Sequence, residues 1–292
     1  MKASGSFTAS VRKRRRTIWQ HGKRSLLRFL FIYLGVVVIV AALESFLMYP
    51  APSPQNGDWK PQLDYEGIEI KTAQGNMIHG WYLEHEAAER TILLCHGNGE
   101  HMGYLGEQLD ELRKIYRANV FAFDYRGYGK SPGKPNEPGI IADGEAAHDW
   151  LAARAGIQAS EVYLWGRSLG GAVAVHLASK NGAKGLIVDR SFNSMVDVAS
   201  NHYPWLPVRL LLSNRWPSEE RIQSYSGPMI SIHGKPDNVV PYRFGRELFE
   251  ACPSDEKEFV LSENLEHNDY WPLEIYRKVL AFMQNCEDSE SS

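Results

Sequence analysis

The sequence has few cysteines, and they follow no metal-binding or disulfide pattern. Cys95, Cys252 and Cys286 lie far apart, with no C-x-x-C pair and no histidines at zinc-finger spacing. We therefore expect no structural metal and at most one disulfide. The chain also lacks internal repeats, and its 43% hydrophobic and 23% charged residues exclude a disordered or collagen-like protein. Its 292 residues leave room for one large core or two small ones.

Acidic side chains are missing from residues 1–28. This segment holds nine Lys and Arg, whereas the rest of the chain has 23 basic and 35 acidic side chains. The protein thus joins a basic tail to an acidic globule, whose carboxylates show no metal-ligand pattern. A basic run can bind nucleic acid, but its position directly before a long apolar run favours a membrane instead.

The apolar run begins at Phe29, has no charge until Glu44, and continues to Tyr49. As a helix, residues 29–49 would be about 31 Å long, which is enough to cross a bilayer core. We predict a retained signal anchor at 29–49, with the tail 1–28 in the cytoplasm and the remainder on the extracytoplasmic side. A signal peptide cleaved near the small residues at 40–42 and a buried core helix are the alternatives.

Proline is frequent just after the apolar run, so we expect residues 50–66 to form a stiff, extended linker. The globular domain should then cover residues 67–285, and residues 286–292 should form an acidic, solvated tail.

From Gly67 onward, short β-rich runs alternate with helical periods. The candidate strands are Ile68–Thr72, Ile78–Leu83, Thr91–Cys95, Val120–Tyr125, Val162–Trp165, Gly185–Asp189, Met229–His233 and Glu258–Leu261. The third to seventh are mostly apolar on both faces, as in a sheet covered by helices on both sides. The pattern predicts an α/β fold with a mostly parallel sheet, whose chemistry lies at the carboxyl ends of the strands.

One strand end carries a G-x-S-x-G pattern. Gly166-Arg167-Ser168-Leu169-Gly170-Gly171 follows a strand and precedes an Ala-rich helix, an arrangement typical of a nucleophile elbow. The glycines permit a sharp turn that would raise Ser168 above the sheet edge, next to a helix amino terminus. An ordinary Gly-rich turn is the alternative.

A nucleophilic serine needs a base and an orienting acid. Asp237 and His267 each follow a later predicted strand, and the order Ser, acid, His is that of the hydrolase triad. Asp189, at the end of the strand after the nucleophile, is the rival acid, with loop bracing or helix capping as its other role.

The oxyanion needs two donors. We predict the backbone N–H of Leu169 and that of Asn98, in the Gly-rich loop after the strand ending at Cys95. We expect the neighbouring His96 to brace this loop rather than to act as the base.

These features resemble the α/β-hydrolase superfamily, and most closely its membrane-anchored α/β-hydrolase-domain proteins, which are grouped near serine aminopeptidase-like and monoacylglycerol-lipase-like hydrolases. The motifs that carry the resemblance are His96-Gly97-Asn98-Gly99, Asp124-Tyr125-Arg126-Gly127-Tyr128-Gly129-Lys130-Ser131, residues 166–171, the Asp237 loop and His267-Asn268. They cover about residues 67–283. The resemblance implies an eight-stranded sheet with an antiparallel second strand, and serine hydrolase activity. Glu266 stands where relatives often have glycine, so the loop that carries His267 departs from the family pattern at this position.

Residues 192–225 form an insertion between two strands that is too apolar for a bare loop. We expect it to be a lid over Ser168 that lines an acyl or aromatic pocket; simple packing on the core is the alternative.

The sequence thus predicts a membrane-anchored serine hydrolase that cleaves an ester, thioester or related acyl bond through Ser168, His267 and Asp237. No cofactor is expected. The partners would be a small-molecule or lipid acyl substrate and the bilayer, with no nucleic acid. An aminopeptidase, which would need acidic side chains for the substrate ammonium, and a non-catalytic scaffold are the alternatives.

Overall fold

A computed structural model describes residues 4–288 of the chain, which divides into two compact units between Leu47 and Met48. Residues 1–3 of the predicted basic tail and 289–292 of the predicted acidic tail lie outside the described residues.

The first unit is dominated by helix α1 (Ser4–Ala42), followed by the short helix α2 (Glu44–Met48). Within α1, residues His21–Ala42 are long and apolar enough to cross a membrane, judged by length and composition. Only 6% of its most apolar window is buried, whereas the core helix considered as an alternative would be mostly buried.

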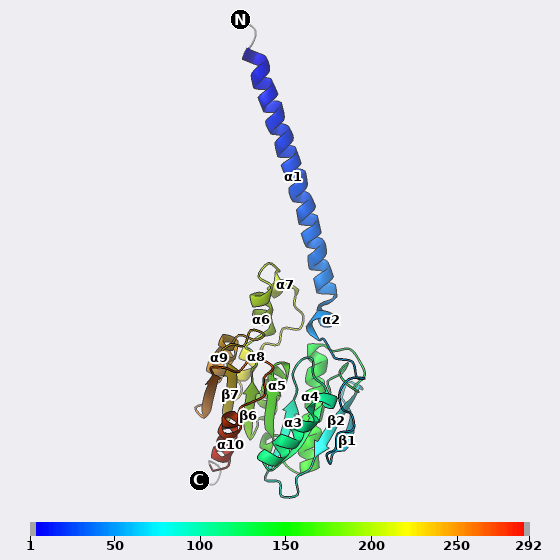
Figure 1. Ribbon diagram of the computed structural model, residues 1–292, viewed down its shortest axis with the longest axis vertical. Helices are drawn as coiled ribbons and strands as arrows, with labels where there is room; N and C mark the ends of the chain where they lie inside the picture. Colours follow the sequence, from blue (N-terminus) through cyan, green and yellow to red (C-terminus); the bar gives the residue numbers. More distant parts are fainter. Residues whose placement is uncertain (1–3, 289–292) are drawn as a thin grey trace. The chain divides into compact units, whose positions relative to one another are not determined.

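The second unit contains one eight-stranded sheet, which confirms the predicted fold class (Figure 1). Its strands are β1 (Glu66–Lys71), β2 (Met77–Leu83), β3 (Arg90–Cys95), β4 (Ala118–Phe123), β5 (Tyr163–Arg167), β6 (Gly185–Asp189), β7 (Met229–Gly234) and β8 (Lys257–Ser262). Their spatial order is β1-β2-β4-β3-β5-β6-β7-β8. Strand β2 runs antiparallel to both β1 and β4, and the other pairs are parallel.

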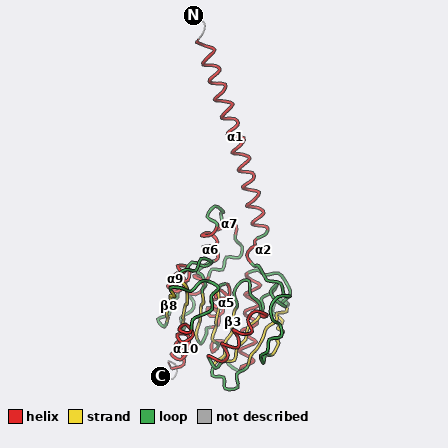
Figure 2. The backbone as a smooth tube through the Cα atoms, viewed as in Figure 1, coloured by secondary structure: helices red, strands yellow, loops and turns green. Residues whose placement is uncertain are grey.

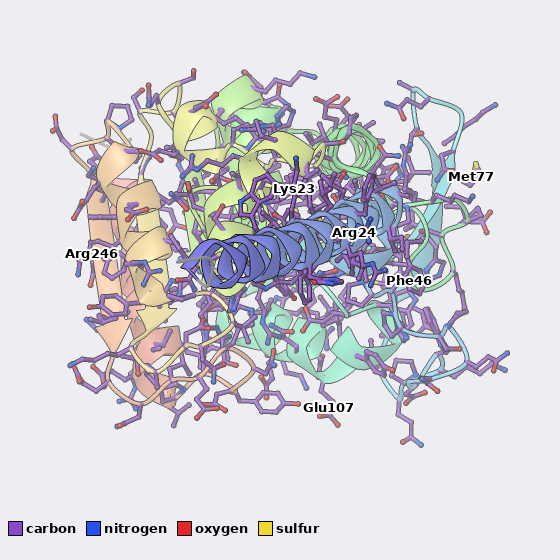
Figure 3. The ribbon with its side chains drawn as sticks, turned by 90° about the horizontal axis from the view of Figure 1, so that it is seen from above. Lys23, Arg24, Phe46, Met77, Glu107 and Arg246 are labelled. Carbon is purple, nitrogen blue, oxygen red and sulfur yellow. The ribbon has the colours of Figure 1, made fainter. Side chains whose placement is uncertain are left out.

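Helices cover both faces of the sheet (Figure 2). They are α3 (Met102–Ile115), α4 (Glu137–Ala155), α5 (Leu169–Asn181), α6 (Met195–His202), α7 (Val208–Leu211), α8 (Ser218–Ile222), α9 (Tyr242–Ala251) and α10 (Leu273–Asp288), with a 3-10 turn at Ala159–Glu161. Helices α3 and α10 pack on one face, and α4, α5, α8 and α9 on the other. Figure 3 shows Glu107 on α3 at one face, with Arg246 and Met77 toward the two ends of the sheet.

The period-two geometry of a strand explains why one apolar run serves both faces. In β3, Leu93 and Cys95 join the cluster beneath α4 and α5, while Ile92 and Leu94 join the cluster beneath α3 and α10. All four side chains are buried. A central strand covered on both sides therefore needs apolar residues at every position, which is the pattern that predicted it.

Helix α4 shows how local sequence fixes an element's ends. The Asn136 side chain accepts a hydrogen bond from the Gly139 N–H at 2.8 Å, which satisfies one of the amino-terminal donors. Gly156 ends the helix in a left-handed conformation (φ +69°) that costs glycine little.

The segment 50–66, predicted to be a stiff, extended linker, packs on the hydrolase unit through several side chains. The ring of Trp59 stacks on His101 at 4.9 Å and contacts Trp81 edge-on, and Pro61 and Leu63 lie against Gly106 of α3. Just before this segment, Tyr49 is buried in the second unit instead of ending a membrane span. The aromatic side chains explain the difference, because burying them gains more than leaving an extended chain solvated. At the other end, the predicted tail from residue 286 begins within α10.

Candidate active site

Ser168 occupies the sharp turn between β5 and α5. Its backbone has φ +51° and ψ −114°, a strained conformation for a residue with a side chain. The turn is held from both sides, since the Ser168 N–H donates to the Asp189 carbonyl at 2.9 Å and the Ser191 hydroxyl donates to the Ser168 carbonyl at 2.8 Å. This is the geometry that the G-x-S-x-G pattern predicts.

Two of the glycines around Ser168 are required by close backbone contacts. A Cβ on Gly166 would lie 2.2 Å from the Gly170 carbonyl oxygen, and a Cβ on Gly170 would lie 1.9 Å from the Cys95 carbonyl oxygen. Both distances are far below van der Waals contact with backbone that cannot move aside. The elbow therefore packs directly against the end of β3, next to residues 96–100, the loop expected to supply an oxyanion donor and called the oxyanion loop below.

Ser168, His267 and Asp237 meet at the carboxyl end of the sheet. His267 Nε2 lies 3.1 Å from Ser168 Oγ, and His267 Nδ1 lies 2.7 Å from Asp237 Oδ2. The three residues are 9%, 8% and 5% exposed. They come from the β5–α5 turn, the β8–α10 loop and the β7–α9 loop, so the arrangement is that of a nucleophile, a base and an orienting acid.

Asp237 stays ionised because of its partners. Burial alone would raise its pKa, but hydrogen bonds from His233, His267 and the Val240 N–H outweigh burial and hold the pKa of Asp237 well below its usual range. Its Oδ1 accepts from the N–H groups of Val239 and Val240 at 3.0 and 2.8 Å. A fixed carboxylate of this kind holds the Nδ1–H tautomer of His267, which leaves Nε2 free to take a proton.

His233 lies on the other side of Asp237 and was not predicted as a site residue. Its Nε2 is 2.8 Å from the Val240 carbonyl and 3.4 Å from Asp237 Oδ2, and its ring is fully buried. Gly245 makes room for it, since a Cβ there would lie 2.2 Å from His233 Nδ1. One signal alone pointed to this role, namely a histidine that ends a predicted strand four residues before the acid.

Asp189, the rival acid, is engaged elsewhere. Its two carboxylate oxygens accept from Arg190 Nε and Nη2 at 2.7 and 2.8 Å. Arg190 also donates from Nη1 to the carbonyls of Glu266 and Asp269. Asp189 therefore acts through Arg190 to brace the loop that carries His267, which is the second role considered for it.

Glu266 fits the base loop without glycine. Its side chain is exposed, its carbonyl accepts from Arg190, and its N–H donates to Asp269 Oδ2 at 2.8 Å. No positive φ is found here among the described residues. The loop that carries His267 therefore needs no glycine at position 266.

Glu100 and Arg167 tie the three loops of the site to one another. Glu100 accepts from Arg167 Nη1 at 2.5 Å and from the Gly97 N–H at 2.6 Å. Arg167 in turn donates to the His267 carbonyl and to Asn268 Oδ1, both at 3.3 Å. The oxyanion loop, the elbow and the base loop are therefore linked through one ion pair.

Leu169 and Asn98, whose N–H groups are expected to be the oxyanion donors, lie in the first turn of α5 and in the loop after β3. Leu169 is the first residue of α5, where the N–H groups have no carbonyl partner within the helix. The Asn98 side chain is fixed at both ends, as its Oδ1 accepts from the Tyr128 hydroxyl at 2.5 Å and its Nδ2 donates to the Met48 carbonyl at 2.7 Å. This fixes the backbone of the oxyanion loop in place.

His96 is a buried residue at the start of the oxyanion loop, and its side-chain contacts are with Gly97 and two tyrosine rings. Its Nδ1 is 2.8 Å from the Gly97 carbonyl, and its ring packs against Tyr125 at 4.3 Å. Burial lowers the pKa of His96, so the ring is neutral near pH 7. The contacts are those of a residue that braces the loop.

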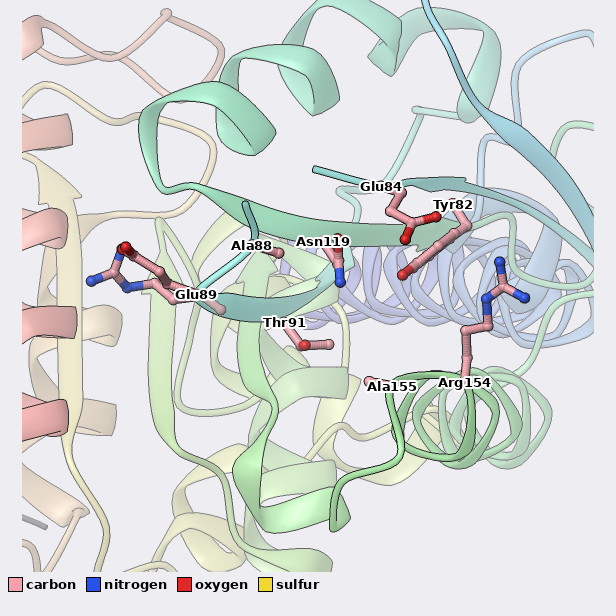
Figure 4. A pocket seen from close by; sticks show the side chains of 9 residues that line it. Tyr82, Glu84, Ala88, Glu89, Thr91, Asn119, Arg154 and Ala155 are labelled. Carbon is pink, nitrogen blue, oxygen red and sulfur yellow. The ribbon is translucent and has the colours of Figure 1, made fainter. Parts of the chain in front are cut away.

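Two cavities of the described residues lie away from the triad. One, of about 460 Å³, is at the amino ends of β3 and β4 and is lined by Tyr82, Asn119 and Arg154 among others (Figure 4). The other, of about 520 Å³, lies beside the Glu100–Arg167 pair, between Trp165, Trp271 and α3. Neither is lined by Ser168, so the geometry of the triad, not cavity volume, identifies the candidate site.

The insertion 192–225 is only partly packed on the core. Its ends are anchored by buried side chains such as Phe192, Trp216 and Ile222, whereas Tyr203, Trp205 and Leu210 in the middle are exposed. Its ends therefore pack on the core, as in the alternative considered for it, while its middle is exposed; a lid over Ser168 stays a prediction.

Known proteins resemble this chain in sequence and in structure. The family model for the alpha/beta hydrolase fold matches residues 90–219. An uncharacterised protein of Mycobacterium tuberculosis is 33% identical over 80% of this chain and 84% of its own length. An uncharacterised membrane protein of Saccharomyces cerevisiae is 31% identical over 72% and 78%. In structure, an esterase of Pyrococcus furiosus superposes with a TM-score of 0.67 at 22% identity, covering 81% of this chain and 97% of that one.

Proposed function

The chain belongs to the α/β-hydrolase fold family, and from this premise we propose that it is a membrane-anchored serine hydrolase acting on an ester, thioester or related acyl bond. Its fold and its esterase neighbours support a hydrolase. The observation that carries the finer proposal is the chain of contacts from Ser168 Oγ through His267 to Asp237, at 3.1 and 2.7 Å.

In the proposed reaction, Ser168 Oγ bonds to the substrate carbonyl carbon while its proton moves to His267 Nε2. Asp237 stabilises the resulting imidazolium, and the N–H groups of Leu169 and Asn98 stabilise the oxyanion. His267 then passes the proton to the leaving group as its bond to carbon breaks, which leaves an acyl-enzyme. A water molecule gives a proton to His267 and attacks the acyl carbon, and the proton returns to Ser168 as the acid departs.

Hydrolysis of nitrophenyl esters tests this proposal. Wild-type protein should hydrolyse a member of a chain-length panel, and Ser168→Ala should lose at least ~10³-fold in kcat. Ser179→Ala is the matched control, because the Ser179 hydroxyl bonds only to carbonyls near α5, away from the elbow. Absence of activity in the wild type, or equal activity in Ser168→Ala, would contradict the proposal.

The peptidase alternative is disfavoured by two carboxylates near the elbow that already have partners. Glu100 is paired with Arg167, and Asp189 with Arg190. Neither is left to hold a substrate ammonium group. Comparing esters with aminoacyl anilides of the same acyl group tests this choice, since faster release from the anilides would favour a peptidase.

For the location, we propose a single-pass anchor at the apolar helix, with the basic segment in the cytoplasm and the hydrolase unit across the membrane. Support comes from the length and composition of His21–Ala42 and from the nine preceding basic residues. Protease added outside sealed vesicles of known orientation tests it. The hydrolase unit should be digested only when it faces outward, and a soluble unit without the first 42 residues would instead indicate a cleaved signal.

A further inference from the structure

The chain enters the hydrolase unit very soon after the apolar helix. His21–Ala42 is the stretch that can span a membrane, and Met48 already belongs to the second unit. Even a fully extended connection from residue 42 to residue 48 covers only about 20 Å. The surface around Met48 and Tyr49 must therefore lie close to any bilayer that holds the helix.

Met48 and Tyr49 are fastened to two parts of the candidate site. The Tyr49 hydroxyl donates to Asn214 Oδ1 and accepts from Trp216 Nε1, both at 3.0 Å, and its side chain is 4% exposed. The Met48 carbonyl accepts from the side chain of Asn98 on the oxyanion loop. The first two residues of the hydrolase unit thus contact both the end of the insertion and the oxyanion loop.

The insertion itself presents an apolar surface, which we call the 203–212 surface. Tyr203, Trp205 and Leu210 are 52%, 55% and 87% exposed. Helix α7 lies within this segment and α6 directly precedes it, and both stand out from the hydrolase unit in Figure 1. Exposed apolar side chains of this size in one projecting segment indicate a surface that meets something other than water.

Charge points to lipid as the occupant. Residues 48–292 hold 23 basic and 34 acidic side chains, yet residues 203–216 contain Arg209 and Arg215 and no acid. Arg209 donates to Asp197 of α6 and remains 71% exposed. Aromatic rings, leucines and arginines without acids are the composition of segments that lie in the headgroup region of a bilayer.

We propose that the 203–212 surface docks on the bilayer that holds the apolar helix, so that the Ser168 site opens toward lipid and receives its acyl substrate from that bilayer. The substrate class is then an amphiphile whose acyl bond lies near the membrane surface. The docking proposal is supported by the 203–212 surface and by the short connection between residues 42 and 48. The substrate class rests in addition on the proposed hydrolase activity.

Docking is measured first, without reference to catalysis. Cys95, Cys252 and Cys286 are buried, so Leu210→Cys in the full chain gives one accessible thiol for an environment-sensitive fluorophore. In lipid vesicles, nitroxide-bearing lipids should quench the Leu210→Cys label about twofold. Ala88→Cys is the matched control, since Ala88 is exposed at the opposite, amino-terminal edge of β3 and should not be quenched.

Equal quenching at the two positions, or none at position 210, would overturn the proposal. So would a signal at position 210 that follows protein density in the vesicle instead of nitroxide content, because that outcome indicates contact with a second copy or another protein.

Substrate delivery is measured second. Leu210→Asp should keep its rate on a short, soluble nitrophenyl ester and lose about fivefold on a long-chain ester embedded in the same vesicles. Leu273→Asp, which changes another exposed leucine (70%) on α10, should affect neither rate. An equal loss on both substrates in Leu210→Asp would contradict delivery from the bilayer. If the wild type hydrolyses neither ester, the proposed function fails, while the quenching result still decides the docking.

Discussion

Two aspartates at adjacent strand ends of this fold have different partners. Asp189 ends β6 and Asp237 follows β7, and the two strands pair in parallel. Both side chains are buried, at 3% and 5% exposed. Both carboxylate oxygens of Asp189 accept hydrogen bonds from the neighbouring Arg190, whereas Asp237 accepts from backbone N–H groups and from His267. The role of a buried carboxylate in this fold therefore depends on its hydrogen-bond partner: arginine makes Asp189 a brace, and histidine makes Asp237 the candidate orienting acid.

The largest expected effect comes from neutralising the acid that faces histidine. Asp237→Asn should lower kcat by about 10⁴-fold, because an amide no longer holds the His267 tautomer that accepts a proton from Ser168. Asp189→Asn should lower kcat far less, since it leaves the triad intact. Steady-state kinetics on one ester checks both, and a larger loss in Asp189→Asn would exchange the two roles.

Removing the arginine should affect stability more than chemistry. Arg190→Met leaves Asp189 as a buried, unpaired charge, which costs about 3–5 kcal/mol and should lower the thermal midpoint of the full chain by about 10 °C. The double variant Asp189→Leu with Arg190→Met should recover part of this loss, because neither charge remains buried. Thermal unfolding in detergent measures both, and no recovery in the double variant would assign the loss to the bonds with Glu266 and Asp269.

Glu100 sharpens the comparison because it is a second carboxylate paired with an arginine. Glu100→Gln should weaken the tie between the oxyanion loop and the elbow and lower kcat about tenfold, well below the loss of a complete oxyanion donor. Glu107→Gln on the surface of α3 is the matched control and should behave as the wild type. A loss as large as that of Asp237→Asn would mean that Glu100 contacts the reacting atoms.

The smallest effect is the pH dependence of stability. The folded pKa of Asp237 lies below the unfolded value of about 3.9, so its charge stabilises the folded state above that pH. This contribution is lost as the pH falls through the folded pKa. The difference in unfolding free energy between wild type and Asp237→Asn should therefore be constant near neutral pH and shrink below about pH 4. A difference that grows on acidification would contradict the assigned direction.

The sequence predicts what local pattern determines. All eight strands follow from short β-rich runs, of which the third to seventh are mostly apolar. The Ser168 turn follows from Gly166 and Gly170, where a Cβ would collide with nearby backbone. The partners of buried charges are set by tertiary contacts, so the pairing of Asp189 with Arg190 and the position of His233 could not be derived from spacing. The segment 50–66 was predicted to be a spacer from its prolines, although Trp59 within it was a signal for packing.

The most direct test of the account is the site of covalent labelling by a fluorophosphonate probe. Peptide mass spectrometry of the labelled full chain should place the adduct on Ser168, and His267→Ala should slow labelling by at least ~10²-fold, because the hydroxyl then has no base. An adduct on another serine, or an unchanged labelling rate in His267→Ala, would contradict the claim that these two residues form the reactive pair.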